Sequence, residues 1–423
     1  MSITIKDITA REILDSRGDP TVEVTAMASN GAAATASVPS GASTGIHEAH
    51  ELRDGDKNRY EGKGVLQAVA HIESEIKQTL IGMQVTNQSI IDQRMIELDG
   101  TTTKHSLGAN AILGVSLAVA RLGALVNNLP LYSYLRQVFS LPLPAKPLPL
   151  PMMNILNGGR HASNDLDIQE FIIIPHLGVK ADLSLKDSIR VGSEIFHELG
   201  RVLHQKKFST DVGNEGGYAP SLKNNEQALG LIIAAVKQSG YSLAKDVDLG
   251  LDVAASEFYK SGKYHFEGKD LSVNELIKIY QSWQDNYQLF SIEDGLAEDD
   301  WQGWHQLTED LGNQVLLVGD DLFVTNKERL ALGAEFKAAN AILIKPNQIG
   351  SLSETVACVL AARRYNYKVV VSHRSGETMD TFIVDLAVAV GADYLKAGST
   401  SRGERVAKYN RLMEIEAERK SSA

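Results

Sequence analysis

Short apolar runs that each end in a polar residue recur through the second half of this 423-residue chain. The last five runs end at Glu293, Asp320, Lys345, His373 and Lys396, and successive ends lie 27, 25, 28 and 23 residues apart. One strand, one loop and one helix take about this length, and segments with helical periodicity lie between the runs. Such a repeat predicts parallel strands joined by helices, the pattern that closes an α/β barrel.

The size of the second half agrees with a barrel. About 270 residues follow the proline-rich segment 141–151, and one α/β barrel takes roughly 250. A doubly wound open sheet is the alternative fold. It is less favoured because no Gly-x-Gly-x-x-Gly fingerprint follows an early strand.

The first 140 residues follow a different pattern. Three strand-like stretches lie between residue 3 and about residue 40 and are separated by SRGDP and SNG turns, and helical periodicity begins after Gly64. These elements predict a compact α+β unit. Segment 141–151 has five prolines in eleven positions and predicts a stiff connector, which divides the chain into domains 1–138 and 139–423. The alternative is that this segment forms a strand in the wall of the second domain.

Composition restricts the classes of function. The formal net charge of −11 argues against a general nucleic-acid binder. The single cysteine, Cys358, cannot form an internal disulfide, and no apolar run approaches the roughly 20 residues of a membrane span. The first 18 residues lack the apolar centre of a signal peptide. We therefore expect a soluble cytoplasmic protein.

Three carboxylates end successive apolar runs in the barrel half. Asp252, Glu293 and Asp320 would converge at the mouth of a barrel, where the C-terminal ends of the strands meet. Three close carboxylates repel one another unless a cation neutralises them, and an all-oxygen ligand set favours Mg²⁺. The alternative is that each acid caps the helix that follows it. Three acids in the same position favour the metal site.

Basic residues end the remaining runs. We expect Lys345 to serve as a base, its pKa lowered by a nearby metal and by Lys396, although salt bridges to the same acids are the alternative. The stretch His373-Arg374-Ser375 would suit a phosphate or carboxylate group. A purely structural histidine is the alternative for His373.

Glycine-rich loops complete the candidate site. The stretch VGNEGGYAP places Glu215 among three glycines, which suits either a plain turn or a catalytic acid close to a substrate. The adjacent Asn214 is expected to lower the pKa of Glu215, because an amide stands where a carboxylate would add negative charge. Segments 40–44 and 156–171 are candidate lids, with ordinary turns as the alternative.

Many ordered segments resemble the enolase family, from the first strand almost to the last residue. They include DSRGDPTVEV (15–24), VPSGASTG (38–45), NILNGG (154–159), EGGYAP (215–220), SIED (291–294), GDDLFVTN (319–326), NQIGSLSE (347–354), VSHRSGET (371–378) and RVAKYN (405–410). The resemblance implies an N-terminal α+β domain followed by an eight-fold α/β barrel. It also implies an Mg²⁺-dependent lyase that dehydrates 2-phosphoglycerate to phosphoenolpyruvate.

The resemblance also implies two Mg²⁺ ions for each site. Asp252, Glu293 and Asp320 would hold the first ion, which also binds the substrate carboxylate. Ser43 would help to complete a second site together with the substrate phosphate. The protein is expected to form a homodimer or a higher homo-oligomer.

The remaining roles concern protons and substrate binding. By resemblance, Lys345 would remove the C2 proton, and Glu215, supported by Glu170, would protonate the departing C3 hydroxyl group. His161 and His373 would assist in catalysis. The implied substrate-binding residues are Gln169, Arg374, Ser375, Lys396 and Ser43.

Several positions depart from the usual family pattern, and four of them bear on the substrate: Arg160, Asn214, Pro346 and Ala397. An added cation and a lost acid would suit a more anionic ligand. An enolase-like paralogue that acts on a related phosphonate, similar to carboxyphosphonoenolpyruvate synthase, is therefore the alternative function. A non-enzymatic scaffold is a third possibility, but it would have no use for the full set of acids and lysines.

Overall fold

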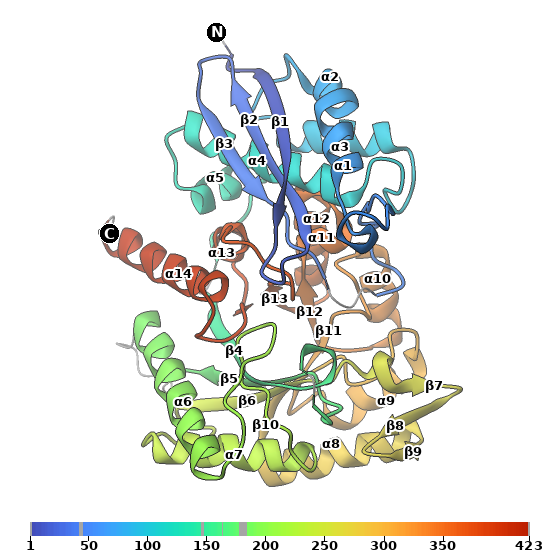
Figure 1. The fold of residues 1–423 in the computed structure, drawn as a ribbon, viewed down its shortest axis with the longest axis vertical. Helices are drawn as coiled ribbons and strands as arrows, with labels where there is room; N and C mark the ends of the chain where they lie inside the picture. Colours follow the sequence, from blue (N-terminus) through green and yellow to red (C-terminus); the bar gives the residue numbers. More distant parts are fainter. Residues whose placement is uncertain (1, 42–44, 145–147, 163, 177–183, 422–423) are drawn as a thin grey trace.

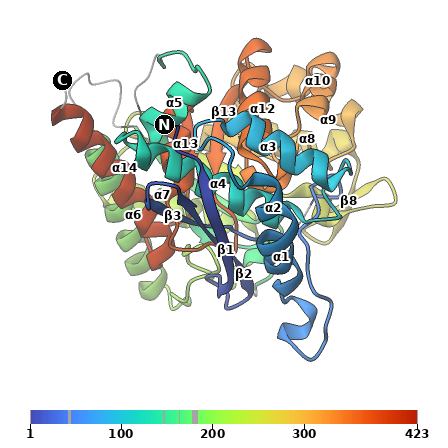
Figure 2. The ribbon, with the colours of Figure 1, turned by 90° about the horizontal axis from the view of Figure 1, so that it is seen from above.

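Two units are stacked in the computed structural model, which describes residues 2–41, 45–144, 148–162, 164–176 and 184–421. An N-terminal sheet with helices lies above a barrel surrounded by helices (Figure 1). The same arrangement seen from above places the N-terminal strands and helices over the barrel (Figure 2). This confirms the predicted α+β unit followed by an α/β barrel. The division between residues 138 and 139 remains a prediction.

The N-terminal sheet is an antiparallel meander of β1 (Ile5–Leu14), β2 (Pro20–Ala28) and β3 (Ala33–Ser37). Strand β2 alternates buried and half-buried residues because only one face of the sheet is covered. The covering helices are α1 (Leu66–His71), α2 (Lys77–Leu80), α3 (Gln88–Asp99), α4 (Ala109–Val126) and α5 (Leu131–Val138).

Helix α4 is long and apolar enough to cross a membrane, with a mean hydropathy of 1.8 over its 18 residues. It is instead a core helix, because 83% of that window is buried and the helix packs on β2 and β3. It is the one helix of this kind within the described part of the chain.

Eight strands close the barrel in the order β10-β11-β12-β13-β14-β4-β5-β6. Their bounds are β4 (Leu150–Asn157), β5 (Glu170–Pro175), β6 (Val247–Asp252), β10 (Leu289–Glu293), β11 (Leu316–Gly319), β12 (Ala341–Ile344), β13 (Lys368–Ser372) and β14 (Tyr394–Lys396). The main helices of this unit are α6 (Leu185–Gln205), α7 (Asn225–Gln238), α8 (Val273–Tyr287), α9 (Trp301–Leu311), α10 (Lys327–Phe336), α12 (Leu352–Arg364), α13 (Phe382–Ala389) and α14 (Gly403–Ser421).

The proline-rich segment ends in the barrel wall. Strand β4 begins at Leu150, and Leu150 and Pro151 pair with Tyr394 and Leu395 of β14. The wall-strand alternative is therefore right for the end of this segment, where β4 joins the last strand and closes the barrel.

One strand runs against the others, so the expectation of parallel strands is wrong for β5. It pairs antiparallel with both β4 and β6. In the described residues of the link between β4 and β5, the short turn η3 (Gly159–His161) is the only helical element, and a parallel return would need a crossover helix. The reversal brings Glu170, the first residue of β5, opposite Asp252, the last residue of β6. Both acids therefore lie at the barrel mouth.

The barrel has two apolar layers because successive residues of its strands point to opposite faces. In β12, Ile342 and Ile344 join the large outer core, whereas Ala341 and Leu343 join a smaller cluster. That smaller cluster fills the inside of the barrel and includes Met152, Ile172, Ile174, Val318 and Val370. The interior is thus packed, and the space for a ligand is at the mouth.

The N-terminal unit contacts the barrel mouth through backbone hydrogen bonds. Ser40 and Gly376 exchange two such bonds, and Ser16 N donates to Glu377 O over 2.7 Å. Ala49 N donates to Gln348 O over 2.8 Å. Residues from both units can therefore meet at one site.

Candidate active site

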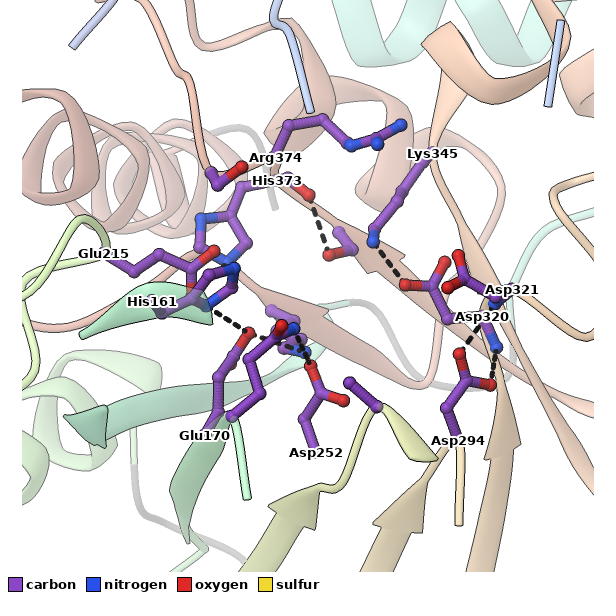
Figure 3. A pocket seen from close by; sticks show the side chains of 15 residues that line it. His161, Glu170, Glu215, Asp252, Asp294, Asp320, Asp321, Lys345, His373 and Arg374 are labelled. Atoms are coloured by element: carbon purple, nitrogen blue, oxygen red, sulfur yellow. Dashed lines mark hydrogen bonds and ion pairs between the residues drawn. The ribbon is translucent and has the colours of Figure 1, made fainter. Parts of the chain in front are cut away.

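A pocket lies at the barrel mouth, and its wall is strongly charged. Figure 3 shows its side chains pointing toward a common centre, with Lys345 and Asp320 on one side and Glu215, His161 and Glu170 on the other. The lining residues are His161, Gln169, Glu170, Glu215, Asp252, Ala254, Asp294, Asp320, Asp321, Lys345, Ser372, His373, Arg374, Ser375 and Lys396.

Almost all of the residues predicted for the site meet here. Eleven of them line the cavity, and Glu293 lies beside it in contact with Lys396. Ser43 lies outside the described residues. The predicted acids Asp252 and Glu293 are the last residues of β6 and β10, and Asp320 follows β11 directly.

Lys396 is the centre of one group of acids. Its Nζ lies 2.8 Å from Glu293 Oε1, 3.0 Å from Asp252 Oδ2 and 3.2 Å from Glu170 Oε1. Burial alone would lower the pKa of Lys396, but the carboxylates of Asp252, Glu170 and Glu293 raise it well above its ordinary value. Lys396 therefore stays charged. In the protein without a metal ion, the salt-bridge alternative describes its position.

The acids still have capacity for a cation. Glu293 Oε2 is buried and has no hydrogen-bond partner among the described residues. Burial and the neighbouring charge of Asp252 raise the pKa of Glu293 to about 8. An unpartnered carboxylate oxygen in an excess of negative charge suits a hard divalent ion. Asp252, Glu293 and Asp320 thus fit Mg²⁺ by their donor atoms.

The site contains a second cluster of acids, which the sequence analysis did not predict. Asp294, Asp320 and Asp321 offer oxygen atoms within 4.8 Å of one another, and Asp294 accepts the backbone N–H groups of Asp320 and Asp321 over 2.8 Å each. Burial and the charge of Asp321 raise the pKa of Asp294 well above its usual range. The segments SIED and GDDLFVTN contain these acids, but a linear pattern does not show that they meet.

Lys345 follows β12 and pairs with Asp320, with 2.5 Å between Nζ and Oδ2. The expectation of a lowered pKa for Lys345 refers to a site that holds a metal ion, and it stays a prediction. Burial acts in that direction, but the carboxylate of Asp320 outweighs it and raises the pKa above its ordinary value. Gln348 donates to the other oxygen, Asp320 Oδ1, over 2.8 Å and holds this carboxylate in place.

Arg374 forms an ion pair with Glu48, an acid that the sequence analysis did not single out. Its Nη1 lies 3.0 Å from Glu48 Oε2, and its Nη2 lies 3.1 Å from Glu48 Oε1. Both side chains are more than nine-tenths buried. Glu48 also accepts from Gly45 N and from the amide of Gln348, each over 3.3 Å. Arg374 is thus held in place by the N-terminal unit.

Glu170 and Glu215 form the opposite side of the cavity. His161 Nδ1 lies between them, 3.6 Å from Glu170 Oε1 and 3.5 Å from Glu215 Oε2, and Asn154 Nδ2 donates to Glu215 Oε2 over 3.0 Å. Burial and the charge of Glu215 raise the pKa of Glu170 well above its usual range. Burial would raise the pKa of Glu215 too, but the adjoining imidazoles, His161 above all, lower it well below its usual range.

The loop of Glu215 requires its glycines. Gly216 has φ +88°, in the left-handed region that favours glycine. A Cβ atom on Gly217 would lie 2.6 Å from Asn157 Oδ1 and 2.9 Å from Leu156 N, so the loop approaches β4 too closely for a side chain. The plain-turn alternative does not explain this close approach.

None of the four departures from the family pattern lines the cavity. Arg160 is half-exposed and pairs with Glu257, with 2.9 Å between Nε and Oε2. Pro346 is the first residue of the short helix α11 (Pro346–Ile349), and Ala397 is fully buried. The backbone oxygen of Asn214 accepts a hydrogen bond from Arg405 Nη2. Asn214 is not the main source of the lowered pKa of Glu215.

Two family models together match nearly the whole chain. The model described as "Enolase, N-terminal domain" matches residues 5–135. The model described as "Enolase, C-terminal TIM barrel domain" matches residues 145–423. These matches agree with the two stacked units and with a charged site at the barrel mouth.

Proposed function

This chain belongs to the enolase family, and we propose that it is an Mg²⁺-dependent hydro-lyase that converts 2-phosphoglycerate to phosphoenolpyruvate and water. One observation carries this proposal. A half-buried lysine, Lys345, faces a pair of buried carboxyl groups, Glu170 and Glu215, across a pocket that Arg374 and Lys396 also line. An elimination needs a base and an acid at opposite ends of a bound anion.

The basic residues suit the two anionic ends of the substrate. Arg374 offers a planar fork of N–H donors, which matches a phosphate group. Lys396 lies within 3.2 Å of Glu170, Asp252 and Glu293, which raise its pKa, and its ammonium group supplies positive charge near the substrate carboxylate. Gln169 donates to Asp252 Oδ2 over 3.3 Å and orients this acid.

Lys345 is the proposed base. In its neutral form it accepts the proton from C2, and the electron pair of that C–H bond delocalises into the substrate carboxylate. Asp252, Glu293 and Asp320 would hold Mg²⁺, which would supply positive charge to offset the negative charge that develops on the substrate. The protein contributes the half-buried position of Lys345, which disfavours an ammonium ion without a partner.

The pair Glu170 and Glu215 is the proposed acid. Burial and the charge of Glu215 raise the pKa of Glu170, whereas the neighbouring imidazoles lower that of Glu215, so a proton on the pair is favoured on Glu170 over Glu215. As the C3–O bond breaks, this proton moves to the departing hydroxyl group, with Glu215 and His161 close enough to share it. The C2=C3 double bond forms and water leaves.

The phosphonate alternative receives no support from the positions that suggested it. Arg160, the added cation, is paired with Glu257 and does not line the cavity. A cytoplasmic location remains a proposal that rests on the composition of the chain, and a homodimer or higher homo-oligomer remains a proposal that rests on the family resemblance.

The test follows the ultraviolet absorbance of the enol double bond after 2-phosphoglycerate is added to folded protein with Mg²⁺. We expect a rise in absorbance that a chelator abolishes. If well-folded, Mg²⁺-loaded protein gives no signal with 2-phosphoglycerate but turns over a phosphonate analogue, the alternative function replaces the proposal.

A further inference from the structure

The segment RVAKYN, residues 405–410, has no role in the reaction as proposed, yet it places two buried cations behind the site. It lies in the first turns of α14, where Arg405 and Lys408 have 0% exposure. Helix α14 lies beside α13 and α6 at the edge of the molecule (Figure 1). Fully buried arginine and lysine side chains are rare unless each charge has partners.

Arg405 contacts the loop that follows β13. Its Nη1 lies 2.5 Å from His373 Nδ1 and donates to Arg374 O over 2.6 Å. Its Nη2 donates to Ser375 O over 2.7 Å. One guanidinium group thus binds three successive residues of the loop that carries the anion-binding groups.

The contact with His373 determines where the proton of the imidazole ring lies. A guanidinium group only donates hydrogen bonds, so His373 Nδ1 must accept this one and cannot carry a proton. Burial, together with the cations Arg405 and Lys396, lowers the pKa of His373 well below its ordinary value, although Glu215 opposes the shift. The ring is therefore neutral, and its single proton is on Nε2.

That proton points at the acid side of the site. His373 Nε2 lies 3.6 Å from Glu215 Oε2 (Figure 3). With the proton on Nε2, the ring presents an N–H donor to Glu215 and to the cavity. With the proton on Nδ1, the ring would present a lone pair to a carboxylate and would face a second donor at Arg405, so both contacts would become repulsive.

Arg405 also contacts the loop of Glu215. Its Nη2 donates to Asn214 O over 3.1 Å, and Ser399 N donates to Glu215 O over 2.9 Å. A Cβ atom on Gly398 would lie 2.8 Å from both Arg405 Cδ and Glu215 O, so these groups are in close contact. Arg405 thus spans the loop of His373 and the loop of Glu215.

We propose that Arg405 is a positioning residue that holds His373 in its Nε2-protonated tautomer, so that the ring N–H faces Glu215 and the acid side of the proposed lyase site. This inference rests on the proposed function for its catalytic meaning. The tautomer itself is a property of the folded chain and can be measured without substrate.

Lys408 provides the matched control. It lies three residues further along α14, is equally buried, and binds the same loop through Glu377 Oε2 at 2.8 Å and Thr378 O at 2.7 Å. In the described part of the chain, its hydrogen bonds and ion pair go to Glu377 and Thr378 and not to His373. Removing its charge should loosen the loop without changing the partner of the imidazole ring.

The experiment is ¹⁵N NMR of histidine-labelled protein, with the signal of His373 assigned by its loss in His373→Gln. We expect the wild-type signal to show an unprotonated Nδ1 and a protonated Nε2. In Arg405→Met the Nδ1-protonated form should become populated, Arg405→Lys should restore part of the wild-type signal, and Lys408→Met should leave it unchanged. Turnover of 2-phosphoglycerate is measured on the same samples, and Arg405→Met should lower kcat by about 10²-fold.

Each outcome decides the inference. A wild-type His373 that carries its proton on Nδ1 overturns the inference, even if Arg405→Met does not fold. An unchanged tautomer in Arg405→Lys and Arg405→Met, or an equal change in Lys408→Met, also overturns it and leaves Arg405 as a structural anchor. The expected tautomers in a protein that does not turn over 2-phosphoglycerate would support the inference and contradict only the proposed function.

Discussion

The guanidinium group of Arg374 and the carboxylate of Glu48 form a two-pronged pair between the barrel and the N-terminal unit, with N–O distances of 3.0 and 3.1 Å. Both side chains are more than nine-tenths buried. The N-terminal unit therefore neutralises the charge that the substrate phosphate would meet.

Replacing Glu48 by glutamine should destabilise the free protein and strengthen its response to anions. Removal of one partner of a buried pair costs about 3–5 kcal/mol, and the remaining amide oxygen should limit the loss to the lower end of that range. Thermal unfolding should show a lower Tm, together with a larger increase of Tm on addition of inorganic phosphate. Glu97→Gln, which alters an exposed pair with Arg94, is the control and should change little. An unchanged response to phosphate would contradict this account of Glu48.

Binding of Mg²⁺ should release protons at neutral pH. The pKa of Glu293 is raised to about 8 by burial and by Asp252, so this carboxyl group is mostly protonated at pH 7 in the metal-free chain. A metal ligand must be deprotonated, and the affinity for Mg²⁺ should therefore rise with pH up to about 8 and then level off. Calorimetry in two buffers of different ionisation enthalpy measures the protons released. Glu293→Gln should abolish the release, and a buffer-independent heat in the wild type would exclude it.

Isotope exchange should distinguish the role of the base, Lys345, from the role of the acid on the opposite side of the pocket. Lys345→Ala should lose both the dehydration of 2-phosphoglycerate and the exchange of its C2 proton with D₂O, because the base is missing. Glu215→Gln should lower dehydration by about 10²-fold or more and retain exchange, because Lys345 is intact. Mass spectrometry of recovered substrate measures the exchange. Retained exchange in Lys345→Ala would assign the base to another residue.

Replacing Arg160 by serine should have a small effect on kcat/KM. Its pair with Glu257 is half-exposed, and such pairs contribute about 0.2–1 kcal/mol, which corresponds to a change of no more than about five-fold. Glu257→Gln should give a similar change, because it breaks the same contact. A much larger loss in Arg160→Ser alone would mean that the guanidinium contacts the substrate, which would favour the phosphonate alternative.

The thiol of Cys358 should resist modification in the folded protein. It lies inside α12 with 0% exposure, and burial raises its pKa to about 12. Little reactive thiolate therefore exists near pH 8. A chromogenic disulfide reagent should react slowly with native protein and at once after unfolding in urea. Rapid reaction of native protein at pH 8 would show that α12 opens locally.

The sequence predicted the barrel because its apolar runs and their spacing are local properties. The same runs placed Asp252, Glu293 and Lys396 at strand ends, since parallel strands of similar length present their last residues at one mouth. The direction of β5 could not be predicted in this way. It depends on the lack of a crossover helix in a glycine-rich stretch that was interpreted as a lid.

The residues that were missed act across long separations in the sequence. The two residues of each contact are far apart in the sequence. Glu48 and Arg374 are separated by 326 positions, Asn154 and Glu215 by 61, and Arg405 and His373 by 32. These contacts depend on how one loop packs against another, and linear periodicity carries no information about that packing. The motifs NILNGG and RVAKYN contained two of the missed residues, but their roles became visible only in three dimensions.

Strand β14 pairs with β4, and α14 follows it at the end of the described chain. Strand β14, which closes the barrel, is therefore synthesised after nearly all of the other site residues. Arg405, which contacts His373, is synthesised after β14. During synthesis the growing chain exposes the acids of the site without Lys396, the cation that neutralises them. A nascent chain of this protein should thus remain catalytically silent until β14 and the first turns of α14 have been synthesised.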